Sequence, residues 1–203
     1  MLSVSLTLES ITIAESQIIR ALSGVSTVAA GLVGRPDKLA IVPQHPLVPT
    51  TPLSLLDFVI YPRQLEPKDE AATIAEMLDP LMRRLGLSYL AERDGGWNAC
   101  ASWEKVLSLG EQQSLGIIRA LVHRPRFALL DACTSAMAED VACEALRIFQ
   151  ERGIAYVSVS QSEALEQFHT QKLRLGEPSA DGWSLTPIVS EAVEEQAQGE
   201  EGS

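Results

Sequence analysis

Two segments in the middle of the sequence have the residue types that binding of a phosphate and a magnesium ion requires. Ser108 precedes a polar, glycine-containing helix start and an amphipathic helix predicted from about Glu111 to Val122, and serine is a preferred N-cap residue. Backbone N–H groups at such a helix start favour a bound phosphate. A basic turn, His123–Arg126, then leads to the hydrophobic run Phe127–Leu130 and to Asp131, a suitable Mg²⁺ ligand at a strand end. An ordinary capped helix is the alternative for Ser108 taken alone.

The elements that must position these residues follow from hydrophobic periodicity and from turn residues. Ser54 predicts a helix N-cap, and Gly24 and Gly86 predict helix ends. Pro80 is expected to break the helix in which it lies. The predicted strands are 2–8, 39–43, 127–131, 154–160, 171–175 and 183–188, and the predicted helices are 16–23, 55–60, 69–85, 111–122, 140–151 and 162–168.

This alternation of strands and helices predicts an α/β fold, with a mostly parallel sheet and helices on both faces. The chain has 203 residues with 46% hydrophobic and 21% charged residues, which fits one globular domain. We expect that domain to span residues 1–188, with a helical subdomain at about 54–123 and a disordered acidic tail at 189–203.

Composition excludes several classes of function. The formal net charge is −11, and an acidic chain without a basic stripe is a poor candidate for binding nucleic acid. No apolar run reaches the roughly 20 residues of a membrane-spanning helix, and no signal peptide is visible, so we expect no direct membrane insertion. The three cysteines lack metal-ligand spacing and indicate reduced thiols facing the cytosol.

Other constellations are weak. His45, His123 and His169 lie on different predicted elements, which favours surface or core histidines over metal ligands. The segment 113–116 lacks the first glycine of a nucleophile elbow, so a serine hydrolase is not expected.

The stretch from Trp103 to Ala136 resembles the nucleotide-binding domain of ATP-binding-cassette (ABC) transporters. Leu107-Ser108-Leu109-Gly110-Glu111-Gln112-Gln113 resembles the family signature, and its inner leucine looks most like subfamily D, the peroxisomal fatty-acyl and cobalamin transporter group with its bacterial relatives. Ser158–Gln161 and the Gly182-Trp183 pair follow the C-terminal pattern of that group, and Pro43-Gln44 resembles its Q-loop. The resemblance implies a P-loop NTPase-like fold with an inserted helical subdomain.

Carried over residue by residue, the resemblance assigns roles to several intact positions. Gln44 corresponds to the Q-loop glutamine beside Mg²⁺, and Asp131 corresponds to the Walker B carboxylate. Ser108 and Gly110, with Gln113 in the same motif, correspond to signature positions that act on nucleotide bound by an opposite subunit. The implied ligands are therefore ATP and Mg²⁺.

The phosphate-binding loop of the family is largely lost. The register places its glycines at Glu9, Thr12 and Ala14, its lysine at Glu15 and its Mg²⁺-binding hydroxyl at Ser16. The glycines let the backbone wrap closely around phosphates. At about 4 Å and an effective dielectric near 20, a glutamate in place of lysine turns roughly 4 kcal/mol of attraction into repulsion.

Three further positions depart from the family pattern. Ala132 stands where the catalytic glutamate is expected, Gln161 where the switch histidine is expected, and Ala138 where the D-loop aspartate is expected. A glutamine can neither shuttle a proton nor carry charge. No catalytic residue is therefore expected to be intact. Few residues precede the loop, so we also expect the family's N-terminal β-subdomain to be missing.

These patterns predict a degenerate ABC nucleotide-binding domain whose signature acts on the ATP of a partner. The resemblance implies a transmembrane domain and a second nucleotide-binding domain as partners, and a place on the cytosolic face of an organelle or bacterial inner membrane. One alternative is an active transporter ATPase whose true N-terminus is missing from the sequence. Another is an interaction module that does not use nucleotide.

Overall fold

The computed structural model describes residues 3–8, 12–26, 32–36, 38–65, 71–93, 95–175 and 183–188, without the side chains of 3–8 and 12–16. A six-stranded sheet forms its centre, in the order β2-β5-β6-β1-β7-β8, and a two-stranded sheet pairs β3 with β4. The predicted acidic tail, 189–203, lies outside the described residues. The strands are β1 Ser3–Leu8, β2 Leu39–Val42, β3 Leu53–Ser54, β4 Cys100–Ala101, β5 Phe127–Asp131, β6 Ala155–Val159, β7 Gln171–Leu175 and β8 Trp183–Pro187.

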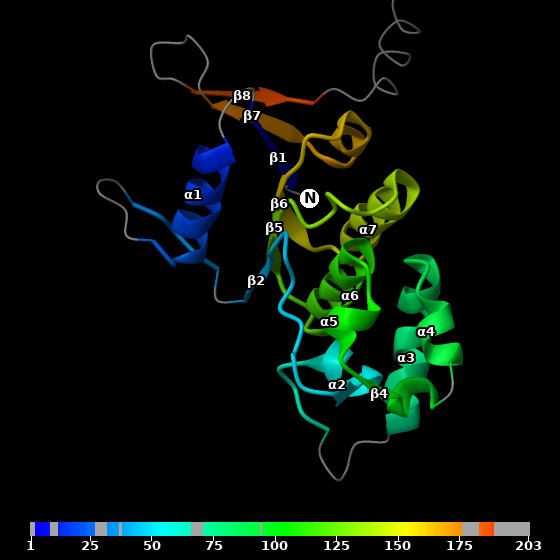
Figure 1. Ribbon diagram of the computed structural model, residues 1–203. Helices are drawn as coiled ribbons and strands as arrows, with labels where there is room; N and C mark the ends of the chain where they lie inside the picture. The colour runs from blue at the N-terminus through cyan, green and yellow to red at the C-terminus, as the bar shows by residue number, and fades with distance from the viewer. Residues whose placement is uncertain are drawn as a thin grey trace, which may run out of the picture.

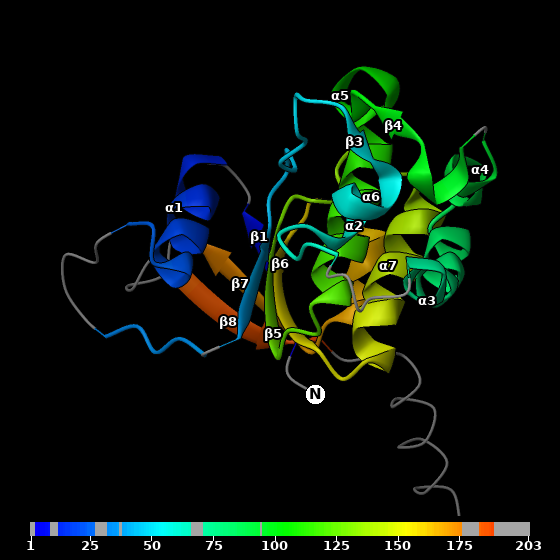
Figure 2. The same ribbon diagram turned by 90° about the horizontal axis from the view of Figure 1, so that it is seen from below.

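Helices cover both faces of the large sheet (Figure 1). Helix α1 lies against one face, and α6 and α7 lie against the other, as the view from below also shows (Figure 2). The helices are α1 Thr12–Ser23, α2 Leu55–Ile60, α3 Ala71–Arg84, α4 Ser88–Glu92, α5 Trp103–Val106, α6 Leu109–Val122 and α7 Glu139–Glu151, with 3₁₀ helices η1 Gly96–Asn98 and η2 Glu163–Phe168.

The pairing of strands confirms the predicted α/β fold with a mostly parallel sheet. Strands β2, β5, β6, β1 and β7 run parallel, and β8 pairs antiparallel with β7. Their parallel arrangement brings the carboxyl ends of β5 and β6 to one edge of the sheet, where Asp131 lies opposite Val159. In such sheets ligands bind at the carboxyl ends of the strands.

Alternation along the central strands divides their side chains between the two faces. In β5, Ala128 and Leu130 belong to the main core under α6 and α7, whereas Leu129 packs with Ile19 of α1. In β6, Tyr156 joins the main core and Val159 joins the small cluster under α1. Strands buried on both faces are therefore apolar at successive positions, as the sequence of β5 shows.

Helices α2, α3 and α4 form a lobe on the far side of α6 from the sheet (Figure 1). Buried Trp103 stacks on Phe58 of α2, with ring centroids 6.4 Å apart, and its indole N–H donates to the Leu53 carbonyl at 2.8 Å. Ser54 caps α2 by accepting from the Asp57 amide at 3.1 Å. The predicted cap at Ser54 is confirmed.

Three elements differ from the sequence-based expectations. Pro80 lies inside α3 without ending it. Its ring is exposed, and proline lacks the N–H that would bond the Glu76 carbonyl. Because Glu76 is also exposed, water can bond that carbonyl instead. Residues 163–168 form a 3₁₀ helix, which tightens the turn before β7. Helix α1 begins at Thr12, whereas the prediction placed its start at Ser16.

Candidate functional site

A cavity of about 410 Å³ opens at the carboxyl ends of β5 and β6, and it gathers several of the residues singled out in the sequence. Gln44, Asp131, Ala132 and Gln161 all line it. They come from the loop after β2, the end of β5 and the loop after β6. Ser135, Ser160 and Glu139 also line it and were not predicted, although the short Ser- and Thr-rich loop after Asp131 was a visible signal. The cavity therefore joins the predicted Q-loop glutamine to the predicted metal-binding carboxylate.

Asp131 is half-buried at the floor of this cavity. Burial raises the pKa of its carboxyl group above the ordinary value. The next residue, Ala132, has a φ of +46°, a left-handed conformation that is unfavourable for a residue with a side chain. Its amide donates to the Val159 carbonyl at 3.2 Å. The chain therefore turns sharply after Asp131, and the position of the expected catalytic glutamate is occupied by a methyl group.

Gln113 connects the two loops that border the cavity. It is fully buried in α6, and its amide nitrogen donates to the Gln44 carbonyl at 2.9 Å and to the Ser135 hydroxyl at 3.1 Å. Its amide oxygen accepts from the Ala136 amide at 2.9 Å. The Gln44 side chain also reaches Ser135, at 3.4 Å. The Gln113 side chain thus holds the cavity walls together through bonds that use both its oxygen and its nitrogen.

Ser108 is the N-cap of α6, as predicted. Its hydroxyl accepts from the Glu111 amide at 3.3 Å and donates to the Glu111 carboxylate at 2.8 Å, and its own amide donates to that carboxylate at 2.7 Å. This reciprocal arrangement is a capping box. Although burial opposes the change, hydrogen bonds from the Tyr89 hydroxyl and from Ser108 lower the pKa of Glu111. The Ser108 hydroxyl therefore already donates its hydrogen bond to the Glu111 carboxylate.

Gly110 lies in the first turn of α6 against the loop that follows β5. A Cβ atom at this position would lie 2.4 Å from the carbonyl oxygen of Ala136. Only glycine allows this approach of two backbones. Ser108 and Gly110 do not line the cavity. The first turn of α6 instead packs against Ala136, in the loop that follows β5.

The positions assigned to the phosphate-binding loop lie after β1, and most of them fall in the first turns of α1. Strand β1 ends at Leu8 and α1 begins at Thr12, so Glu9–Ile11 are the only residues between them. Ala14, Glu15 and Ser16, assigned to the last glycine, the lysine and the hydroxyl, are helical. The side chain of Ser16 lies outside the description. Of the positions in the register, residues 12–16 are therefore helical, and Glu9 lies outside the described residues.

Arg119 fixes the segment that follows Gln44, and the sequence did not single it out. Its guanidinium donates to the Leu47 carbonyl at 2.9 Å and to the Phe58 carbonyl at 3.0 and 3.2 Å. Its Cζ also lies 4.6 Å from the centroid of the Phe58 ring. Burial lowers the pKa of Arg119, yet the three carbonyl contacts hold the charge in place. Helix α6 therefore positions the loop of Gln44 at two points, through Gln113 and Arg119.

Two of the three histidines contact backbone carbonyl groups, His123 that of Tyr61 at 3.0 Å and His169 that of Leu165, and His45 is exposed. His169 is buried, its Nε2 lies 2.6 Å from the Ser158 hydroxyl and its Nδ1 lies 2.8 Å from the Leu165 carbonyl. Burial lowers its pKa, against the opposing effects of its hydrogen bonds to Leu165 and Glu166 and of the Glu166 charge. Within the described ranges no three His, Cys, Asp or Glu side chains group as metal ligands. None of the described helices combines the length and apolarity needed to cross a bilayer.

Solved structures of ABC transporters share this fold. A bacterial Atm1-family ABC exporter with ATP bound superposes with a TM-score of 0.69 at 20% identity, covering 86% of this chain and 32% of that one. An inward-facing ABC transporter described as metal-chelate type superposes with a TM-score of 0.65 at 17% identity, covering 91% of this chain and 72% of that one. No protein-family model matches the chain.

Relatives by sequence identify the family more narrowly. ABC transporter D family member 1 of Arabidopsis thaliana is 37% identical over 172 residues, which are 77% of this chain and 13% of that protein. ATP-binding cassette sub-family D member 3 of Mus musculus is 32% identical over 182 residues, 89% of this chain and 27% of that protein. The lysosomal cobalamin transporter ABCD4 of Mus musculus is 35% identical over 162 residues, 77% of this chain and 25% of that protein. The chain belongs to subfamily D of the ABC transporters, and it spans 13% to 27% of the length of these relatives.

Proposed function

We propose that the chain is a degenerate nucleotide-binding domain of an ABC transporter, whose signature turn completes an ATP site held mainly by a second domain. The observation that carries this proposal is the division of the site. Ser108 caps α6 and Gly110 lies in its first turn, whereas the P-loop positions Thr12 to Ser16 belong to a helix and include an acid at the lysine position. The chain keeps what it would present to a partner and lacks what it would need to hold a triphosphate.

The site residues fit Mg²⁺ and nucleotide only as part of a composite site. Asp131 is half-buried and Gln44 lies close by, so these two side chains would hold the ion. Bound Mg²⁺ would supply positive charge against phosphate oxygens. The methyl group of Ala132 cannot activate a water, and Gln161 cannot transfer a proton. We therefore infer that this half of the site binds and orients without catalysing hydrolysis.

Ser108 has to change partners before it can contact a phosphate. The amides of Leu109 and Gly110, in the first turn of α6, have no acceptor within the helix and point outward. The Ser108 hydroxyl donates to Glu111 at 2.8 Å, so an incoming phosphate oxygen would replace the carboxylate as its acceptor. Because both are anions, the Glu111 side chain has to turn away as a phosphate approaches.

The proposal includes partners and a location. The relatives are named as transporters, so we propose a transmembrane domain and a second nucleotide-binding domain as partners, with the chain at the cytosolic side of a membrane. Residues 1–188 would form the nucleotide-binding domain, and about 54–123 its helical subdomain. Helices α2, α3 and α4, which gather beyond α6 (Figure 1), support that division.

Equilibrium binding of a fluorescent ATP analogue with Mg²⁺ tests the proposal. We expect no binding to the chain alone, and ATP-dependent association when the intact nucleotide-binding domain of a subfamily D relative is added. Ser108→Asn keeps an N-cap residue but removes the hydroxyl, so it should weaken this association while the helical content stays unchanged. Leu109→Ala in the same turn is the matched control.

Two results would contradict the proposal. ATP hydrolysis by the purified chain alone, abolished in Asp131→Asn, would show an active ATPase. Absence of any nucleotide response, with and without the partner, would show an interaction module that does not use nucleotide.

A further inference from the structure

A second pocket lies at the amino ends of β5 and β6, whereas Asp131 lies at the carboxyl end of β5. It has a volume of about 680 Å³ and is lined by the loops α6–β5 and α7–β6. The two loops are bonded to each other, since the Ala155 amide donates to the Arg126 carbonyl at 3.3 Å. Strand β5 separates this pocket from the Asp131 cavity, and its length of about 13 Å follows from the rise per residue. The pocket is therefore a separate site, within the size range of small-molecule pockets.

Three arginines line this pocket: Arg124, Arg126 and Arg152. Lys38 adjoins them, because its carbonyl accepts from the Arg126 amide at 3.2 Å. In the part of the chain that the structure describes, none of the three arginines has a carboxylate partner. The nearby acid, Glu151, is bonded to Arg84 instead. Although the net charge of the chain is −11, three arginines that form no ion pair with a described carboxylate lie together at this pocket.

The backbone at Arg124 departs from what stability alone would favour. It follows the C-cap of α6, His123, and has a φ of +46°. Glycine is the usual residue at this position because a Cβ atom is strained there. An arginine in a strained conformation, with its side chain at a pocket, indicates a function that outweighs the strain.

The electrostatics of Arg152 agree with mutual repulsion in this cluster. Burial and the neighbouring Arg124 and Arg84 lower its pKa, and only Glu151 opposes them. Its Nη1 donates to the Leu121 carbonyl at 3.2 Å, which fixes the guanidinium at the pocket wall. An anion in the pocket would relieve this repulsion.

We propose that the pocket between Arg124, Arg126 and Arg152 binds a phosphate-bearing small molecule. Guanidinium groups present planar pairs of N–H donors that match the oxygens of a phosphate. Three of them on two joined loops suit a ligand with more than one phosphoryl group. This site does not depend on the proposed nucleotide site at Asp131.

Isothermal titration calorimetry with inorganic pyrophosphate, in the presence of EDTA and at constant ionic strength, tests the proposal. Wild-type chain should bind, and Arg152→Gln should weaken binding at least about tenfold, since hydrogen bonds between charged groups are among the stronger ones. Asp131→Asn should bind as wild type does, which separates this site from the proposed nucleotide site.

Arg124→Gly excludes misfolding as an explanation. Because glycine accepts the positive φ, this variant should have a denaturation midpoint at or above that of wild type, and yet bind pyrophosphate at least about tenfold more weakly. Arg93→Gln is the matched control, because this substitution also removes one positive charge. Arg93 lies near Glu111, at the other end of α6 from the pocket. Equal weakening in Arg93→Gln, or absence of binding to wild type at millimolar pyrophosphate, would overturn the proposal.

Discussion

At the scale of single residues, Asp131 forms no ion pair within the part of the chain that the structure describes. Its carboxyl group is half-buried, and burial raises its pKa. In the folded protein the proton is therefore held more tightly than in the unfolded chain, where the pKa is about 3.9. The stability that this group contributes is present below that value and is lost as pH rises through the folded pKa.

Asp131→Asn should therefore be more stable than wild type at pH 7, and the difference should vanish near pH 3. Urea denaturation of both proteins at the two pH values measures it. Asp140→Asn removes an exposed acid from the first turn of α7, where a negative charge is favourable. This control should show a small loss at pH 7. Equal stability of Asp131→Asn and wild type at pH 7 would mean that the charge costs nothing in this cavity.

Gly110 has a structural role as well as its place in the signature. Gly110→Ala would bring a Cβ atom to 2.4 Å from the Ala136 carbonyl oxygen, so backbone has to move. We expect a loss of about 1–3 kcal/mol in the free energy of unfolding, measured by chemical denaturation. Gly34→Ala, where the added Cβ would meet nothing within 4 Å, should change stability little. An unchanged Gly110→Ala would show that the loop after β5 yields easily.

Residue patterns predicted part of the site and missed another part. Ser108 and Asp131 were predicted from cap and strand-end signals and Gln44 from the family resemblance, and the structure places Gln44 and Asp131 at one cavity. The linking role of Gln113 depends on bonds to residues 44, 135 and 136, which no local pattern reports. A polar residue on the face of α6 that also carries buried Ile117 was the available signal.

At the scale of elements, α7 begins without a side-chain cap. Its N-cap residue is Ala138, the position that the family resemblance assigns to the D-loop aspartate. Ala138→Asp should raise the free energy of unfolding by about 1 kcal/mol, measured by urea denaturation. Ala138→Asn should give most of the same gain, because an amide oxygen also accepts from the first turn. A gain with Asp alone would assign the effect to charge and the helix dipole.

Long periodic elements were predicted well because each carries its own signal. The predicted helices 69–85, 111–122 and 140–151 match α3, α6 and α7 to within two residues at each end. Short elements such as α4 and the pair β3 and β4 were missed, since two to five residues carry no readable period. Helix α1 begins four residues before the predicted start at Ser16, and the family register is set from that predicted helix.

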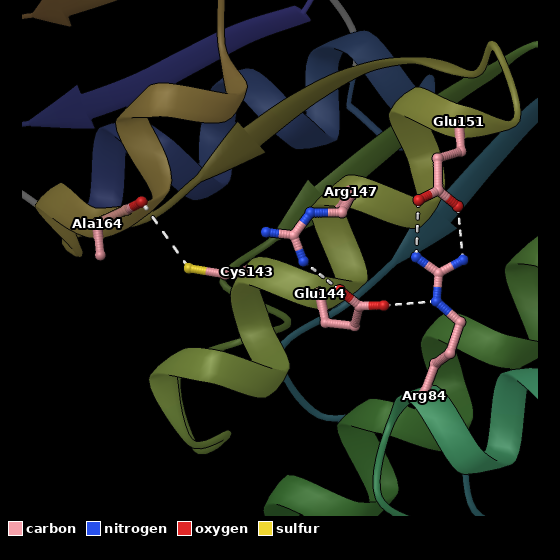
Figure 3. A network of polar contacts seen from close by, with 6 residues as sticks. All are labelled: Arg84, Cys143, Glu144, Arg147, Glu151 and Ala164. Atoms are coloured by element: carbon pink, nitrogen blue, oxygen red, sulfur yellow. Dashed lines mark hydrogen bonds and ion pairs between the residues drawn. The ribbon is translucent and has the colours of Figure 1, made fainter.

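At the scale of the whole molecule, Arg84 joins the lobe of α2, α3 and α4 to helix α7, which packs against the sheet. Figure 3 shows its guanidinium, at the end of α3, between two acids of α7. It donates to Glu151 at 2.5 and 2.9 Å and to Glu144 at 2.5 Å. Glu144 also pairs with Arg147 of its own helix. Hydrogen bonds from Arg84 lower the pKa of both Glu144 and Glu151.

Lowered carboxyl pKa values determine the pH dependence of this link. The stability that it contributes is present above the unfolded pKa of glutamate, about 4.3, and is lost as pH falls through the folded pKa values. Arg84→Gln should therefore lower the urea midpoint at pH 7 and leave it unchanged near pH 3. Arg83→Gln, which removes a neighbouring exposed arginine of α3, controls for net charge. Equal midpoints for Arg84→Gln and wild type at pH 7 would show that these partly exposed pairs contribute nothing measurable, so that apolar packing alone holds the lobe on α7.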